Sequence, residues 1–389
     1  MQPKIYISSI SSISALGKSS EDVWNSYVKG KSFFQKKEFS EKECFVVPLT
    51  DASEKIVEDF LQKNPDYERL DRSVVLALIA AENAFKNINF FSLNIGINIG
   101  SSRGATALFE KYHEQFLNQE NLSPLASPTT TLGNISSWVG QHLAIDGPTI
   151  GHSVTCSTAL HAMLNGIAWL KADMTDAFVV GGSEAALTPF TIAQMKALKI
   201  YSNETVEFPC RSMDFKKEKN TMVLGEGAAV AVLSKELSKQ TEAEILGYGF
   251  ASEKIEHSGS ISEHADCFQK SMKMALDSAE IKSVDVAVLH APGTKKGDLA
   301  EYNAINKVFS EKLPLLTSNK WLVGHTFAAS GMLSVEMAVM MLKNNRFIEN
   351  PFFKIDLEIP KKLQTIMINA VGFGGNAVSI IIGKPKMDE

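Results

Sequence analysis

A cysteine directly before a predicted helix has the strongest potential in this sequence for nucleophilic chemistry. An extended run over residues 149–155 leads into Cys156, and apolar residues then recur at helical spacing as far as Leu170. The free N–H groups and the positive end of the helix dipole favour a thiolate at such a position and can hold an oxyanion during acyl transfer. We therefore predict a nucleophilic Cys156, although a small, buried and inert cysteine fits the same pattern equally well.

Two histidines in the second half of the chain lie where catalytic side chains are common in α/β proteins. His290 ends the apolar run VAVLH and opens a turn-rich loop that continues to Asp298. His325 follows Gly324 and precedes small residues and an apolar helical pattern. A rigid strand end beside an open loop can present an imidazole to a substrate. Considered without the other motifs, His290 is better explained by a structural role than by a catalytic one. For His325, the structural and the catalytic role explain the sequence equally well.

A glycine-rich turn near the end of the chain surrounds one aromatic residue, Phe373. The sequence NAVGFGGN continues into an apolar strand pattern at 379–382 and lacks the Lys-Ser/Thr pair of a phosphate-binding loop. The turn is either an ordinary connection or a flexible gate that carries Phe373.

The composition of the 389-residue chain excludes several functional classes. With 44% hydrophobic residues, 21% charged residues and a net charge of −5, it is too apolar for general disorder and too weakly basic for a nucleic-acid binder. Four cysteines without a CxxC pair indicate neither a disulfide framework nor a zinc site, and His152 and His161 complete no known ligand set with Cys156. No apolar run approaches the ~18 residues that cross a bilayer, and the first residues, MQPKIYISSISSISALG, lack the continuous apolar stretch expected of a secretory signal. We expect a cytoplasmic protein without a bound metal, a membrane span or a nucleic-acid partner.

Short β-type runs alternate with helical patterns, which predicts an α/β layered fold with mostly parallel sheets. Buried strands are expected at 5–7, 93–99, 177–180, 228–233, 284–289 and 379–382. Helices are expected at 72–85, 157–171, 267–279 and 332–342. A polar interruption at 233–244 divides the chain into segments 1–238 and 239–389 of similar content, so we predict two related halves. The polar stretch KKEKN at 216–220 is expected to form an exposed loop.

Taken in order, these blocks resemble the β-ketoacyl-[acyl carrier protein] synthases of the thiolase superfamily, most closely the elongating type. The shared blocks are Cys156 with the later GGSE, the HxxGTxxGD loop from His290, the SxKxxxGH block with Lys320 and His325, and the GFGG turn. Any one block is a weak signal, but four in this order are hard to obtain by chance. The resemblance implies a thiolase-like fold of two similar α/β halves in five layers, αβαβα, usually assembled as a dimer.

The resemblance also implies roles for individual residues. Cys156 would be the nucleophile, His290 and His325 would complete the triad, and Lys320 would support the histidines electrostatically. The N–H groups of Cys156 and Phe373 would form an oxyanion hole, with Phe373 also acting as a gate. Further substrate contacts would come from Thr294, which would touch the pantetheine arm, and from Gly374 and Asn376.

The implied reaction is decarboxylative Claisen condensation between an acyl group on Cys156 and malonyl-acyl carrier protein. It would extend a fatty-acyl, polyene or polyketide chain by two carbons, and no cofactor is implied beyond the phosphopantetheine arm of the carrier protein. The histidine and glycine-rich blocks contain no second cysteine, which favours condensation over thiolysis. Two alternatives stay open: a non-catalytic partner subunit resembling a chain-length factor, and an acyltransferase that condenses poorly. A homodimer and a heterodimer with a related ketosynthase-like subunit are both compatible with the sequence.

Several positions depart from the family pattern. Ala291 and Pro292 replace a Gly-Thr pair, and Ser334 stands where a glutamate is usual. Glu336 follows two residues later, which rotates it by about 200° around a helix. The GFGG turn continues with Asn376-Ala377 instead of Thr-Asn. These changes predict a specialised, secondary-pathway synthase.

A basic patch is expected near the entrance, because carrier proteins are acidic. The candidate contacts are Arg69, Arg72, Lys216 and Lys217. Ordinary solvated surface charge explains each of the two lysines at least as well.

Overall fold

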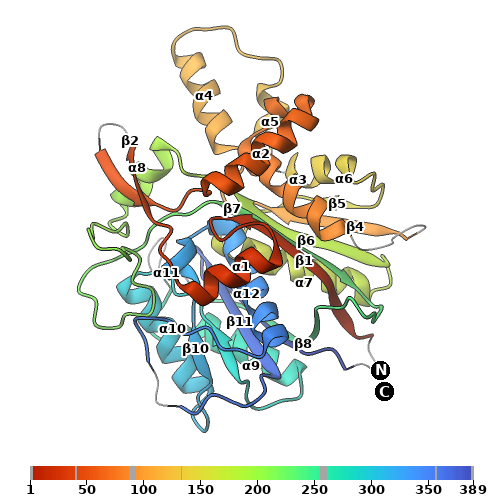
Figure 1. The fold of residues 1–389 in the computed structure, drawn as a ribbon, viewed down its shortest axis with the longest axis vertical. Coiled ribbons are helices and arrows are strands. Elements are labelled where there is room, and N and C mark those ends of the chain that lie inside the picture. The colour runs from red at the N-terminus through yellow and green to blue at the C-terminus, as the bar shows by residue number, and fades with distance from the viewer. Residues whose placement is uncertain are drawn as a thin grey trace.

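The structure is a computed structural model that describes residues 3–39, 42–86, 93–132, 134–254, 261–354 and 357–386. Its strands form one ten-stranded sheet and a separate small hairpin, in a layered α/β arrangement with helices (Figure 1). All of the predicted strands and helices are confirmed, with boundaries shifted by a few residues. Among the described residues, we find no helix with the length and hydropathy needed to span a membrane.

The first half of the chain supplies five neighbouring strands in the order β1-β7-β6-β4-β5. Their bounds are Ile5–Ser14 (β1), Ile95–Gly100 (β4), Thr149–Ile150 (β5), Ala177–Glu184 (β6) and Gly227–Ser234 (β7). From β1 outward, two antiparallel pairings are followed by two parallel ones. The hairpin of β2 (Gln35–Phe39) and β3 (Lys42–Val46) lies outside this sheet.

The second half repeats the pattern in the order β8-β12-β11-β9-β10. Its strands are Ala243–Ser252 (β8), Val286–Val288 (β9), Leu315–Thr317 (β10), Thr365–Gly372 (β11) and Asn376–Gly383 (β12). From β8 outward, two antiparallel pairings again precede two parallel ones. The prediction of mostly parallel sheets is therefore wrong, because in each half the strands next to the joint run antiparallel to their neighbours.

The halves join where Ile5–Ile7 of β1 pairs antiparallel with Ala243–Ile245 of β8. The predicted boundary between residues 238 and 239 falls in the connection from β7 to β8 and stays a prediction.

Helices cover both outer faces and fill the space between the two halves of the sheet (Figure 1). The outer helices of the first half are α3 (Arg72–Phe85) and α6 (Asn134–His142). Those of the second half are α9 (Asp266–Ser278) and α10 (Lys295–Val308). The central helices α7 (Thr158–Lys171) and α12 (Ser330–Asn344) pack into one apolar core with strands of both halves. The buried stretch of α12 is apolar nearly all round, as expected for a helix inside a layered core.

The remaining elements are shorter or peripheral. They are α1 (Ser20–Lys29), α2 (Asp51–Lys63), α4 (Thr106–Leu117), α5 (Ala126–Thr130), α8 (Pro189–Ala197), α11 (Lys320–Val323) and the 3-10 turns η1 (Pro65–Arg69), η2 (Thr155–Ser157) and η3 (Phe327–Ala329). Three of them, η2, α11 and η3, lie in the loops that carry the candidate catalytic residues.

Candidate active site

Cys156 lies in the turn η2 at the start of α7, as predicted from the sequence. Its side chain is only 4% exposed. Burial and then the nearby Glu184 raise the pKa of the thiol to about 12, while Lys320 lowers it in part. The resting residue is therefore a neutral thiol. The helix N-terminus alone does not produce the thiolate that its position favours, because the cost of burying a charge is larger.

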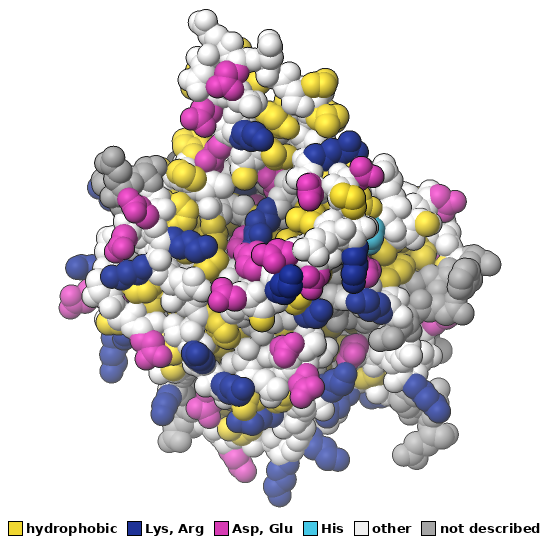
Figure 2. All heavy atoms as spheres, turned by 45° about the horizontal axis from the view of Figure 1, so that its top comes forward, with side chains coloured by type: hydrophobic (Ala, Val, Ile, Leu, Met, Phe, Trp, Pro, Cys, Tyr) yellow, Lys and Arg dark blue, Asp and Glu magenta, His cyan; other side chains and the backbone are white. Residues whose placement is uncertain are grey.

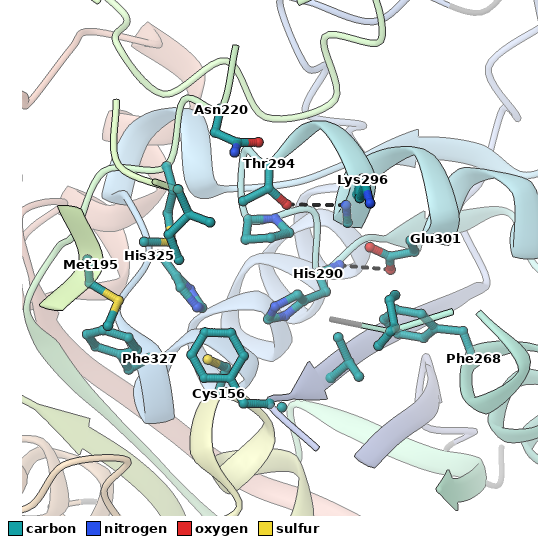
Figure 3. A pocket seen from close by; sticks show the side chains of 18 residues that line it. Cys156, Met195, Asn220, Phe268, His290, Thr294, Lys296, Glu301, His325 and Phe327 are labelled. Carbon is teal, nitrogen blue, oxygen red and sulfur yellow. Dashed lines mark hydrogen bonds between the residues drawn. The ribbon is translucent and has the colours of Figure 1, made fainter. Parts of the chain in front are cut away.

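The two predicted histidines converge with Cys156 on one cavity of about 210 Å³. His290 follows β9, and His325 lies between α11 and η3. Their ring centroids are 5.3 Å apart with an interplanar angle of 87°. Figure 3 shows both imidazoles pointing toward the side of the cavity where Cys156 lies. Residues from both halves of the chain thus form a single site.

Both imidazoles are neutral in this environment. Burial lowers the pKa of His325 to about 3, with a further contribution from the Lys320 ammonium. Burial, Lys320 and His325 together hold the pKa of His290 well below its usual value. Neutral rings can each donate one N–H to a substrate oxygen without a protonation step.

Buried acidic residues on α10 hold the loop that carries His290. Glu301 accepts the backbone N–H groups of His290 at 2.9 Å and Ala291 at 2.8 Å. Asp298 accepts the N–H of Gly293 at 3.0 Å. Glu301 was not predicted from the sequence, and no helix was expected at this position. The signal that could have found it is the pair of acidic residues three apart, Asp298 and Glu301, directly after the loop, since residues at this spacing share one face of a helix.

Lys320 is fully enclosed, and burial lowers its pKa to about 8. Its Nζ lies 3.4 Å from Oδ1 of Asn319, which the Ser334 hydroxyl also contacts at 3.5 Å. Glu336 instead accepts a hydrogen bond of 2.7 Å from the hydroxyl of Ser12. A neutral amide therefore lies beside the lysine, and the carboxylate of Glu336 binds elsewhere. Among the nearby charged groups, Glu301 has the largest opposing effect and raises the pKa of Lys320.

We predict that Glu336→Gln reduces the pH dependence of stability. Burial raises the pKa of Glu336 to about 7 from an ordinary 4.5. Its neutral form thus stabilises the fold fully below pH 4.5, and this contribution is lost as the pH rises through 7. Urea unfolding at pH 5 and pH 8 should show a smaller loss of unfolding free energy for the variant than for the wild type. Equal losses would contradict this, and Glu349→Gln, at an exposed glutamate, is the control.

The glycine-rich turn connects β11 to β12, and β11 contacts the nucleophile turn η2. A Cβ at Gly372 would lie 2.3 Å from Oγ1 of Thr155 and 2.4 Å from the carbonyl of Val154, so only glycine allows this approach. Phe373 lines the cavity and is 40% exposed. This position is compatible with the predicted role of Phe373 as a gate. Two predicted substrate contacts, Gly374 and Asn376, are not among the described residues that line the cavity.

Thr294 lines the cavity and caps α10 by accepting the N–H of Gly297 at 3.2 Å (Figure 3). Pro292, one of the departures from the family pattern, lines the same cavity. Further lining residues that the sequence analysis missed are Met195, Ile200, Asn220, Met222, Lys296 and Phe327. Several of these lie within residues 195–222, a segment for which the sequence predicts no catalytic motif. Within the described ranges, no cluster of three or more His, Cys, Asp or Glu is placed to hold a metal ion.

Two of the four predicted carrier-protein contacts, Arg72 and Lys217, form ion pairs with acidic residues of this chain, and the role of all four stays a prediction. Lys217 is buried and forms an ion pair with Asp298 at 2.5 Å, so the prediction of an exposed loop is wrong at this residue. The side chain of Arg72 forms ion pairs with Glu54 and Glu226.

The other two predicted contacts are exposed: Arg69, whose guanidinium lies 5.9 Å from the centroid of the Trp138 ring, and Lys216. Figure 2 shows basic and acidic side chains interspersed over the face it displays. This face therefore carries no broad area of positive charge alone.

Two models of known protein families match this chain, one in each half. The model of the β-ketoacyl synthase N-terminal domain matches residues 2–239, and that of the C-terminal domain matches residues 242–352. Curated relatives include the 3-oxoacyl-[acyl-carrier-protein] synthase 2 of Staphylococcus aureus, 28% identical, and that of Coxiella burnetii, 27% identical. Each alignment covers 98% of this chain and 98% of the relative.

Solved structures share the fold over nearly the whole chain. A β-ketoacyl synthase from Burkholderia phymatum aligns with a TM-score of 0.84 and 20% identity, and the ishigamide ketosynthase/chain length factor with 0.84 and 19%. Each alignment covers 99% of this chain and 100% of the other. The fold is thus the thiolase-like one expected from the sequence. Since the N-terminal family model alone spans more than half of its residues, this chain belongs to the β-ketoacyl synthase family.

Proposed function

We propose that this protein condenses an acyl group held on Cys156 with malonyl-acyl carrier protein, with loss of carbon dioxide. The observation that supports this most strongly is the convergence of one thiol and two neutral imidazoles on a single buried cavity. The substrates would arrive on the phosphopantetheine arm of the carrier protein, and the proposal needs no other cofactor. Thr294 and Pro292, on the loop after β9, would line the path of that arm.

In the first step, the sulfur of Cys156 attacks the thioester carbonyl of the acyl-carrier protein. The carbonyl oxygen becomes an oxyanion, which the N–H groups of Cys156 and Phe373 would stabilise. The carrier-protein thiol leaves with the proton that the Cys156 thiol has lost, and one thioester replaces another. Three apolar side chains that line the cavity and belong to one hydrophobic cluster with Cys156 would contact the acyl chain: Met195, Met222 and Phe327.

In the second step, the malonyl thioester loses carbon dioxide, and its electron pair forms an enolate. His290 and His325 would each donate an N–H to the enolate oxygen. The hydroxyl of Ser330 accepts the N–H of Thr326 at 3.1 Å and lies 3.1 Å from Nδ1 of His325. A neutral His325 that accepts at Nδ1 carries its hydrogen on Nε2, the nitrogen available to the substrate.

In the third step, the enolate carbon attacks the acyl thioester on Cys156. The new carbon–carbon bond extends the chain by two carbons, and the Cys156 thiolate leaves and takes up a proton from solvent. Lys320 would favour this thiolate, because its ammonium lowers the pKa of Cys156.

The partner subunit is a second part of the proposal. Solved relatives include a ketosynthase, ApeO, in complex with its chain length factor, ApeC, from Xenorhabdus doucetiae, with a TM-score of 0.83 and 22% identity. We propose that this chain is the catalytic member of such a pair, or of a homodimer. The cysteine and both histidines are present, which a non-catalytic subunit does not require.

Intact-mass analysis with a panel of acyl-carrier proteins, combined with a carbon dioxide release assay, tests this proposal. We expect the acyl mass on the peptide containing Cys156, and carbon dioxide release from malonyl-carrier protein with formation of the longer β-ketoacyl product. Acylation without carbon dioxide release would indicate an acyltransferase that condenses poorly. Absence of both, alone and with a candidate partner subunit, would overturn the proposal and indicate a non-catalytic subunit.

A further inference from the structure

The GGSE block ends in a carboxylate that the proposed mechanism does not use. Glu184 is the last residue of β6, and its side chain is fully buried. It is not among the described residues that line the cavity, so it is not placed to touch a substrate. Burial raises its pKa to about 7, and its charge in turn raises the pKa of the Cys156 thiol. A buried carboxylate that opposes the thiolate is unfavourable on both counts and calls for another explanation.

In the first half of the chain, Glu184 holds the loop after β4 against the nucleophile turn. Its carboxylate accepts the backbone N–H groups of Ser102 at 2.8 Å and Arg103 at 3.2 Å. The hydroxyl of Ser102 donates to the carbonyl of Thr155, 2.7 Å away. Thr155 directly precedes Cys156 and has a φ of 49°, a left-handed conformation that β-branched residues rarely adopt. The strained turn that presents the sulfur is thus tied to Glu184 through one serine.

In the second half of the chain, the same carboxylate holds the turn that follows His325. It accepts the N–H of Ala328, in η3, at 3.3 Å. Gly182, two residues before Glu184, allows this approach, because a Cβ there would lie 2.4 Å from the carbonyl oxygen of Ala328. The preceding Phe327 has a φ of 43°, and its ring packs against that of His325 at a centroid distance of 5.3 Å. Left-handed strain of this kind persists only where surrounding contacts impose it.

We propose that Glu184 is a positioning residue that holds the nucleophile turn and the His325 turn at their reacting separation. This inference rests on the proposed function, in which the enolate bound by the imidazoles must reach the acyl group on Cys156. A displacement of reacting atoms by about 1 Å can lower a rate by about 10²-fold. A single carboxylate bonded to both turns restrains such displacements.

The two oxygens of Glu184 divide these donors between them. Oε1 accepts from the hydroxyl of Ser101 at 2.9 Å and from the N–H of Arg103. Oε2 accepts from the N–H groups of Ser102 and Ala328. Glu184→Gln keeps the size of the side chain but replaces one oxygen with an NH₂ group, which cannot accept, and the remaining amide oxygen is a weaker acceptor than a carboxylate. Contacts to both turns are therefore weakened in this variant.

We expect Glu184→Gln to lower the kcat of condensation by about 10²-fold, with the KM for both carrier-protein substrates within about threefold of the wild type. Amide hydrogen exchange, measured by mass spectrometry in peptides that cover residues 99–106 and 324–330, should become faster in both segments. The matched control is Glu336→Gln, which alters another buried glutamate outside the described cavity lining and should change neither readout.

A second variant, Ser102→Ala, keeps the carboxylate and removes only the hydroxyl that reaches Thr155. Acylation of Cys156 should fall by about tenfold, as expected for one lost hydrogen bond, while carbon dioxide release from malonyl-carrier protein stays at the wild-type rate. This variant keeps the proposal testable if Glu184→Gln does not fold.

A wild-type kcat for Glu184→Gln, or unchanged exchange in either segment, would overturn the proposal. Wild-type acylation by Ser102→Ala would overturn it as well. Faster exchange throughout the chain would also do so, since the loss of kcat would then reflect general instability. Hydrogen exchange does not depend on the reaction. If the wild-type protein released no carbon dioxide, faster exchange confined to the two segments of Glu184→Gln would keep Glu184 as the link between the turns and reject the proposed function.

Discussion

Replacing Cys156 with alanine is expected to reduce condensation by at least about 10³-fold, because the acyl group loses its covalent attachment point. The other parts of the site are not expected to change, since Cys156 makes no structural bond to the histidine loops in the described residues. Carbon dioxide release from malonyl-carrier protein should therefore persist, as the two imidazoles that would stabilise the enolate are still present. Product formation and gas release, measured on the same sample, check both statements.

The control for this variant is Cys267→Ala, which alters a buried cysteine in the outer core of the second half. It should condense at close to the wild-type rate. Condensation by Cys156→Ala at a rate within tenfold of the wild type would show that another group carries the acyl chain. Loss of gas release together with condensation would show that the thiol also takes part in decarboxylation.

Replacing His325 with alanine is expected to reduce decarboxylation by about 10² to 10³-fold, the usual effect of removing one donor to an oxyanion. Acylation of Cys156 should be reduced much less, because the proposed oxyanion hole for that step is formed by backbone N–H groups. Intact-mass measurement of acylation and carbon dioxide release by the same variant separate the two steps. The backbone hydrogen bond from the N–H of residue 325 to the carbonyl of Val223, 2.7 Å long, does not depend on the imidazole.

His113→Ala is the matched control for the histidine variant. His113 is on α4, outside the cavity lining, and its ring stacks on the exposed ring of Phe109 at a centroid distance of 6.2 Å. This variant should decarboxylate normally. If His325→Ala kept decarboxylation but lost acylation, the imidazole would serve as a base for the thiol instead of a donor to the enolate.

The nucleophile could be located from the sequence because its signals are local. An extended run, small residues and a helical repeat place Cys156 at the start of α7 without any long-range information. The two histidines could be placed at loop starts in the same way, but their convergence with Cys156 followed only from the family resemblance. Spacing along the chain says nothing about side chains that meet across two halves of a fold.

Features that depend on distant partners could not be predicted. Lys217 lies in a strongly polar pentapeptide, yet it is buried because Asp298 on α10 provides a carboxylate for it. The direction of the strands next to the joint is likewise set by how the halves pack, and periodicity is the same for parallel and antiparallel strands. The thiol pKa depends on burial, which a helix-dipole argument does not include.

The joint between β1 and β8 has a consequence for how the chemistry depends on the rest of the molecule. The sulfur belongs to one half and both imidazoles to the other, so either half alone would hold a nucleophile without donors or donors without a nucleophile. The docking of the halves, through three residue pairs of the joint and the α7–α12 core, sets the reacting distances. Turnover is therefore a sensitive reporter of that docking: a slight loosening would lower the rate while both halves keep their secondary structure.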